Sequence, residues 1–182
     1  MNTRINYLSS RLLRALAFLI FLSGCAGSPG SIQTLQPLVP GIDLREFQRL
    51  SIVVLATPDV SVDEVAFARL HDLIVHEIQK HSDNHFVHIL DKPGDSPSLE
   101  GELVLTQYDE GNAGMRFVLA GLGAMSVEGD LTIRDGITHQ VYRQQRVSKV
   151  FAWGGIYGAI TTIQDVEVGF AKAVAEALMS PE

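Results

Sequence analysis

Apolar residues recur at different spacings along this chain, and the spacing predicts which segments are strands and which are helices. Leu50–Ala56 is a short, almost continuous apolar run ending before Pro58, which is typical of a buried strand. The next segment, to about His81, repeats apolar residues every three or four positions and predicts an amphipathic helix. Phe86–Leu90 predicts a second strand, so this part should form a βαβ unit with a right-handed crossover.

The predicted helix has a recognisable start and one apolar face. Ser61 and Glu64 have the spacing of a capping box, in which each side chain bonds the backbone amide of the other residue. The face that should pack on the sheet is formed by Phe67, Leu70, Ile74 and Ile78.

From Gly101 onward the period changes to two, which predicts strands buried on one face only. Glu102–Tyr108 and Met125–Arg134 are two such strands, and the second continues through a turn into a partner that runs to about Phe151. A two-residue turn at Asp135–Gly136 would leave Ile137 on the polar face. A three-residue turn that also includes Arg134 places Ile137 on the same face as Ile133, and we therefore expect the longer turn.

The last predicted element is a helix over about Ala159–Met179, with an apolar stripe of Ile163, Val166, Phe170, Val174 and Ala177. The element order is βαββββα. It predicts an α/β (α+β) fold with one mixed sheet of four to five strands and both helices on one face.

The first residues have the pattern of a secretion leader. Arg4, Arg11 and Arg14 precede the apolar run Ala15–Leu22, which is well short of the roughly 20 residues that span a bilayer. Leu22–Cys25 follows directly and resembles the lipobox of bacterial lipoproteins. We expect residues 1–24 to be removed and Cys25 to carry the lipid. The alternative is an ordinary secretory leader in which Cys25 has no such role.

The composition of the chain after the leader predicts a flexible tether followed by one folded domain. Residues 26–40 are rich in Gly, Ser and Pro, so 25–44 are predicted to be the lipidated cysteine and a flexible tether, and 45–182 a single periplasmic domain. Ala26 follows the cysteine, and resemblance to enteric sorting, in which Asp at that position retains lipoproteins at the inner membrane, implies the outer membrane. Cys25 is the only cysteine, so the domain must fold without a disulfide.

Charge argues against nucleic acid as a partner. Three of the 14 basic residues and none of the 21 acidic residues lie in the leader, so the mature chain has 11 basic against 21 acidic side chains, a net charge of −10. Such a surface repels phosphates, and the lipid rather than charge must hold the protein at the membrane.

The most distinctive internal motif contains Gly111, Asn112, Arg116, Gly121 and Gly123. Together with the Asp135–Gly136 turn and the glycines of the 153–158 connector, it resembles an uncharacterised family of small bacterial outer-membrane lipoproteins over roughly residues 45–180. That resemblance implies an envelope location and no activity. The opening βαβ unit also looks like the amino-terminal domains of TolB type.

The glycine pair of this motif invites comparison with a phosphate loop. Gly121 and Gly123 precede a strand, whereas a dinucleotide loop follows a strand and opens a helix, so we expect them to shape the chain. Arg116 is expected to pair with Asp109 or Glu110, or to cap carbonyl groups. The alternative for Arg116 is an anion-binding site.

Five of the six histidines lie between His71 and His88. His76 and Glu77 begin like a zinc-protease helix, but Lys80 stands where the second histidine is required. We expect these histidines to be solvated, the alternative being a surface site for zinc or nickel.

No nucleophile, base or pair of carboxylates has the spacing of a known catalytic motif, so no catalytic residue is predicted. No cofactor is expected. The sequence therefore favours a lipid-anchored, non-catalytic envelope module that binds another protein. The alternatives are a self-assembling envelope or secretion component that uses an apolar strip at Trp153–Ile160, and a metal-dependent hydrolase that uses the His71–His88 window.

Overall fold

The computed structural model describes residues 26–82, 85–86, 88–90 and 98–180. The predicted leader and Cys25 lie outside these residues. Within them, no helix is long and apolar enough to cross a bilayer.

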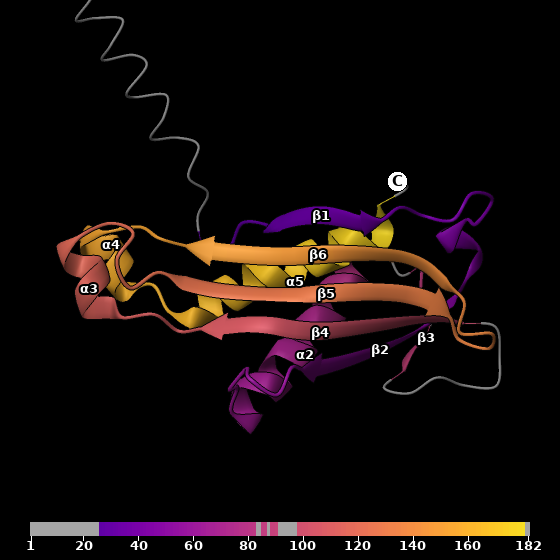
Figure 1. Cartoon of the computed structure of the whole chain (residues 1–182), viewed down its shortest axis with the longest axis horizontal. Coiled ribbons are helices and arrows are strands. Elements are labelled where there is room, and N and C mark those ends of the chain that lie inside the picture. Colours follow the sequence, from indigo (N-terminus) through magenta and orange to yellow (C-terminus); the bar gives the residue numbers. More distant parts are fainter. Residues whose placement is uncertain (1–25, 83–84, 87, 91–97, 181–182) are drawn as a thin grey trace, which may run out of the picture.

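One mixed sheet of six strands forms the centre of the molecule, in the order β1-β6-β5-β4-β2-β3 (Figure 1). β2 is parallel to both of its neighbours, β3 and β4, and the other pairs are antiparallel. The strands are β1 (Ser31–Gln36), β2 (Arg49–Ala56), β3 (His88–Leu90), β4 (Leu99–Asp109), β5 (Met125–Asp135) and β6 (Val141–Phe151). The predicted fold class is confirmed, and the parallel β2–β3 pair is the predicted βαβ unit, but the sheet has six strands rather than the predicted four to five because β1 adds an edge strand.

Two long helices, α2 (Glu64–His81) and α5 (Ile163–Met179), cover the same face of the sheet (Figure 1). They bury apolar side chains such as Leu70, Ile74 and Phe170 against the inward-facing residues of the central strands. None of the described helices covers the opposite face (Figure 1), which carries the polar residues of the alternating pattern. There Arg146 on β6 contacts Asp130 on β5 at 2.7 Å, and Arg134 contacts Glu102 at 2.6 Å.

A buried carboxylate joins both helices to the sheet. Glu167 of α5 has no exposed surface, and its oxygens accept from Arg69 Nε of α2 at 2.7 Å and Arg69 Nη2 at 2.9 Å. The Tyr108 hydroxyl of β4 donates to the same carboxylate at 2.7 Å. Burial and this hydrogen bond raise the pKa of Tyr108 above its usual range. The triad therefore fixes α2, α5 and β4 relative to one another.

The prediction of a flexible tether through residue 44 is wrong for the described part of that segment. Ser31–Gln36 forms strand β1, which pairs antiparallel with β6, for example Ile32 with Val147. Ala26 is only 3% exposed, and Leu44, in a single 3-10 turn (Leu44–Glu46), is also buried. β1 is an edge strand with mostly exposed side chains, so it needs no run of apolar residues and gave no hydrophobic signal.

The two predicted helix boundaries also shift. Asp63, not Ser61, caps α2, because its Oδ1 accepts from the amides of Val65 and Ala66 at 2.9 Å each. α5 begins at Ile163, where Thr162 and Asp165 form the capping box. The residues before it belong instead to a separate short helix, α4 (Gly155–Ile160).

The β5–β6 turn is longer than either predicted form. β5 continues to Asp135, whose Oδ1 accepts from the amides of Ile137 at 2.9 Å and Thr138 at 2.7 Å. The chain then passes through His139 at φ 56° before β6 begins at Val141. Ile137 is exposed at the turn, so the assumption that it faces the core was the source of the error.

Candidate functional site: an apolar tip

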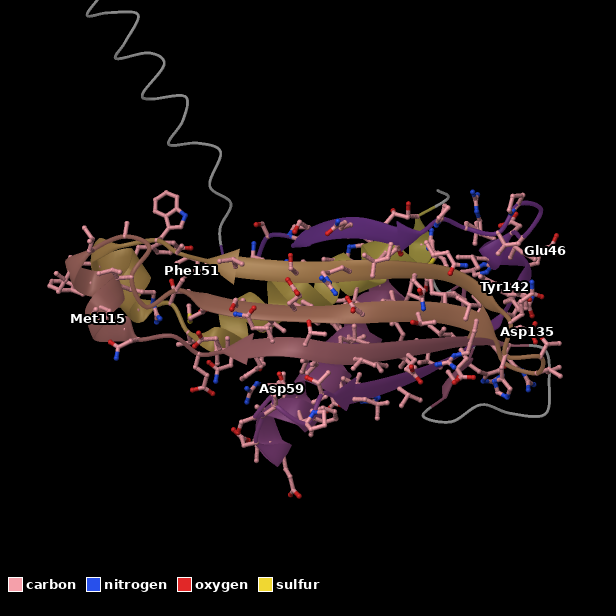
Figure 2. All side chains as sticks on the ribbon, in the orientation of Figure 1. Glu46, Asp59, Met115, Asp135, Tyr142 and Phe151 are labelled. Carbon is pink, nitrogen blue, oxygen red and sulfur yellow. The ribbon has the colours of Figure 1, made fainter. Side chains whose placement is uncertain are left out.

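Two segments project beyond one end of the sheet and pack on each other (Figure 1). Residues 110–124 connect β4 to β5, and the part from 111 to 124 contains the short helix α3 (Ala113–Val118); residues 152–162 connect β6 to α5 and contain α4. The segments 111–124 and 152–162 form the projection, and the exposed Asp109 and Glu110 lie just before the first of them. We call these two segments the apolar tip. Figure 2 places Met115 of α3 and Phe151, at the end of β6, at this end of the molecule, with Asp135, Tyr142 and Glu46 at the other.

The surface of the apolar tip is hydrophobic and uncharged. Val118, Ile156 and Ile160 are 79%, 73% and 68% exposed. Eight of the fourteen exposed large hydrophobic side chains among the described residues lie here, namely these three with Met115, Phe117, Leu119, Leu122 and Tyr157. The two segments contain a single charged side chain, Arg116, and it is buried. Contiguous apolar surface of this kind marks a contact site for a partner or a membrane.

Arg116 holds the tip together from inside. Its Nε donates to the carbonyl of Gly158 at 2.8 Å, its Nη1 to that of Gly123 at 2.7 Å and more weakly to that of Glu110 at 3.5 Å, and its Nη2 to that of Thr161 at 3.2 Å. The guanidinium therefore satisfies carbonyls on both segments, including the end of α4. Of the predicted partners, it uses backbone carbonyls rather than the carboxylates of Asp109 or Glu110. Only 3% of Arg116 is exposed, so its charge is not presented to a ligand at the surface.

The other motif residues shape the entry and exit of α3. The Asn112 side chain caps the helix by accepting from Met115 N at 3.0 Å, and its own amide donates to Gly123 O at 3.1 Å. Gly111 and Gly123 have φ of 62° and 67°. A methyl group on Gly111 would collide with the carbonyl groups of Gly123 and Ala124, and one on Gly123 would collide with the carbonyl of Asn112. Gly121 also has a positive φ, 90°, but open space surrounds it. The structure thus brings all five predicted motif residues together in one lobe.

Aromatic side chains line the base of the second segment. The Tyr157 ring meets Trp153 edge-on with 6.0 Å between centroids, and it meets Phe151 in the same way at 5.7 Å. Gly154 allows this segment to approach the chain just after α3, since a methyl there would lie 2.8 Å from Ala120 N. The sequence hypothesis identified the apolar strip at Trp153–Ile160 but missed the matching half on α3. The signal in the sequence is that residues 111–124 and 152–162 contain one charged residue between them, Arg116.

The histidine window does not converge. His81 Nδ1 lies 2.9 Å from the carbonyl of Glu77 on its own helix, and His85 Nε2 lies 3.1 Å from that of Phe47. No three His, Cys, Asp or Glu side chains among the described residues are placed to hold a metal ion. The alternative of a metal-dependent hydrolase therefore gains no support from these histidines.

A small hollow lies at the opposite end of the molecule. Its volume is about 240 Å³, and its lining includes Leu38, Leu44, Phe86 and Leu178. Typical small-molecule pockets hold about 300–1,000 Å³ and combine apolar walls with convergent polar groups. Asp43 and Arg45 also line the hollow, but both are exposed and contact each other. The Arg45 amide donates to Asp43 Oδ1 at 2.9 Å, and Arg45 Nε lies 3.8 Å from the same oxygen. These two residues therefore supply no polar group that converges on the inside of the hollow.

No protein-family model matches the chain, and no curated protein matches it significantly in sequence. Solved structures do share its fold. A PelC dodecamer from Paraburkholderia phytofirmans in space group P6 superposes with a TM-score of 0.57 at 8% identity, covering 84% of this chain and 99% of that chain. A variant PelC dodecamer from the same organism in space group C2 gives 0.55 over the same coverage.

A Xanthomonas campestris protein of the DUF330 family is less similar, with a TM-score of 0.44 at 13% identity over 84% of this chain and 86% of that one. The shared property with PelC is the fold. Membership of the uncharacterised lipoprotein family and the likeness to TolB-type domains stay predictions.

Proposed function

We propose that this chain is a lipid-anchored, non-catalytic component of the cell envelope that assembles with further copies of itself. Its leader would be removed after Gly24, and Cys25 would carry the lipid that holds the periplasm-facing domain at the outer membrane. The lipobox pattern at Leu22–Cys25 supports the anchor. The net charge of −10 worked out above for the mature chain supports partners other than nucleic acid.

The observation that carries self-assembly is the exposed edge formed by β1. Proteins usually defend an exposed edge strand with Lys, Pro, an inward-pointing charge or a β-bulge, because its free amides and carbonyls can pair with another chain. Ser31–Gln36 contains no Lys, Pro or charged residue, and five of its six side chains are exposed. Its register with β6 shifts only near the end of the strand, between Thr34 and Gln36. Leu35, 46% exposed, adds an apolar contact on this edge. The strand is therefore suited to pairing with a second polypeptide.

The comparison with PelC favours another copy of this chain as that polypeptide. PelC has this fold over almost its whole length and forms dodecamers in two crystal forms. Head-to-tail assembly requires two different surfaces on each subunit, and an open sheet supplies two different edges, β1 and β3. A heterologous envelope protein that adds to β1 is the second candidate, and the test below separates the two.

Light scattering coupled to size-exclusion chromatography tests the proposal on residues 26–182, which include every element of the fold. We expect a species several times the monomer mass that dissociates when Leu35→Lys places a charge on the edge. Val65→Lys is the control, because Val65 is 73% exposed at the start of α2 and lies outside both edge strands of the sheet. A monomer in this experiment, and again for the lipidated protein in detergent, would contradict self-assembly.

A further inference from the structure

The described chain starts close to the apolar tip. Ala26 is buried, and the residues after it are fixed to the second and third turns of α5: Gly30 N donates to Gly169 O at 3.0 Å, and Lys172 Nζ donates to Gly27 O at 2.6 Å. Gly169 lies six residues into α5, roughly 9 Å along its axis from Ile163. α5 itself follows α4 directly. The first described residue is thus held at the same end of the molecule as the tip.

In this arrangement no flexible segment separates the proposed lipid on Cys25 from the folded domain, because Ala26 is already buried. A free segment of 15 residues could have extended roughly 50 Å, whereas the single peptide unit from Cys25 to Ala26 spans about 3.8 Å. A lipid on Cys25 would therefore hold this end of the domain against the bilayer surface.

Among the described surfaces near this end, the tip is the one whose chemistry suits a bilayer. Residues 111–124 and 152–162 expose no charged side chain, and the exposed Asp109, Glu110 and Asp165 lie at the base of the tip, whereas the mature chain as a whole has a net charge of −10 and would be repelled by anionic lipids. Exposed aliphatic and aromatic side chains on a short, rigid projection can enter the boundary between head groups and acyl chains. Trp153 and Tyr157 are the residue types that concentrate at that boundary.

We propose that the apolar tip inserts into the membrane surface beside the lipid on Cys25, as a second contact that orients the domain. The residues that enter the bilayer are Phe117, Val118, Leu119, Leu122, Ile156 and Ile160, and Arg116 keeps α3 and α4 together as a unit. This inference rests on the proposed lipid anchor. It assigns the tip to lipid rather than to a second copy of the chain, which uses the β1 edge.

Trp153 is the only tryptophan and lies within the tip, so its fluorescence reports insertion directly. The mature lipidated protein is reconstituted into phosphatidylcholine vesicles in which part of the lipid carries bromine on its acyl chains. We expect strong quenching and a blue shift of the emission. Vesicle association without quenching would overturn the inference while leaving the anchor intact, and no association at all would refute the anchor as well.

Variants of the unlipidated chain, residues 26–182, test which residues are responsible. We expect Val118→Asp combined with Ile156→Asp to lower vesicle partitioning at least tenfold. The control is Val65→Asp, because Val65 at the start of α2 is 73% exposed, the same fraction as Ile156. Figure 2 shows Asp59, on the approach to that helix, well away from the tip. Equal partitioning of the tip variant and the wild type, or loss of self-association by the tip variant without vesicles, would overturn the assignment to lipid.

Discussion

Gly121 and Gly123 offer a test in which two similar substitutions should have different results. Both have a positive φ, 90° and 67°, and both lie in the loop after α3. They differ in their surroundings. A methyl group on Gly121 would meet no atom within 4 Å, whereas one on Gly123 would collide with the carbonyl of Asn112 and lie 2.9 Å from the Cβ of Met115. Alanine at each position therefore separates backbone strain from steric overlap.

The magnitudes follow from these two contributions. An alanine forced into the left-handed region costs on the order of 1 kcal/mol, which is the whole expected effect of Gly121→Ala. At Gly123 the overlap involves backbone and a Cβ that cannot turn away, and overpacking of this kind adds roughly 1–3 kcal/mol. The shift also disturbs the carbonyl that accepts from Arg116 Nη1 at 2.7 Å. We expect Gly123→Ala to lower the free energy of unfolding by about 3 kcal/mol.

Thermal unfolding of residues 26–182, followed by circular dichroism, measures the difference. For a domain of this size 1 kcal/mol corresponds to roughly 2–4 °C in Tm, so Gly121→Ala should lower Tm by about 3 °C and Gly123→Ala by about 9 °C. Equal shifts would mean that the packing around Gly123 is looser than the structure shows. An unchanged Tm for both, accompanied by loss of a bound anion, would refute the scaffold role and restore the loop as a binding site.

Three further predictions concern the anchor, the turn and the buried triad. Cys25→Ala should leave an unprocessed protein without a stable outer-membrane anchor; mature protein in the outer-membrane fraction of that variant would contradict the lipobox. Asp135 accepts from the amides of Thr138 and Ile137, which holds the pKa of its carboxyl below the usual value, so its contribution to stability is present above about pH 4 and is lost as the pH falls through that lowered pKa. The difference in unfolding free energy between wild type and Asp135→Asn should accordingly be largest near neutrality and shrink toward pH 2, and a constant difference would be evidence against the turn. Tyr108→Phe removes one hydrogen bond to the buried Glu167 carboxylate and should lower the free energy of unfolding by about 1.5–3 kcal/mol in urea, whereas an effect below about 0.5 kcal/mol, the usual range for surface changes, would show that the bond is not formed.

Strong periodicity made the sheet and its two long helices predictable. The face of α2 that carries Leu70, Ile74 and Ile78 is buried as the spacing predicts, because a helix gains most of its stability by covering that stripe. In β5, buried and partly exposed side chains alternate from Val127 to Ile133, as a period of two predicts. In these segments local pattern and tertiary packing agree, so the pattern alone was sufficient.

The edge strand and the two tip helices were not predictable from the same signal. β1 is stabilised by backbone bonds to β6 rather than by burial, and its sequence is nearly as polar as a linker. α3 and α4 are six residues each and expose their apolar side chains, so no amphipathic period exists to be read. They are held together by Arg116, whose Nε donates to the carbonyl of Gly158, more than forty residues further along the chain, and by glycines that let the two segments approach closely. That fit is visible only in three dimensions.

The pairing of β1 with β6 also orders events during folding. Ser31 pairs with Ser148, so β1, the first described strand, must wait for β6, the last described strand, before it can join the sheet. Contacts this distant in sequence form late, because the whole intervening loop must close first. On the proposed route of export and lipidation, this order would leave the residues before β1 accessible to processing enzymes until β6 has emerged. Once β6 is available, β1 joins the sheet and Ala26 is buried, so modification of Cys25 would have to precede completion of the fold.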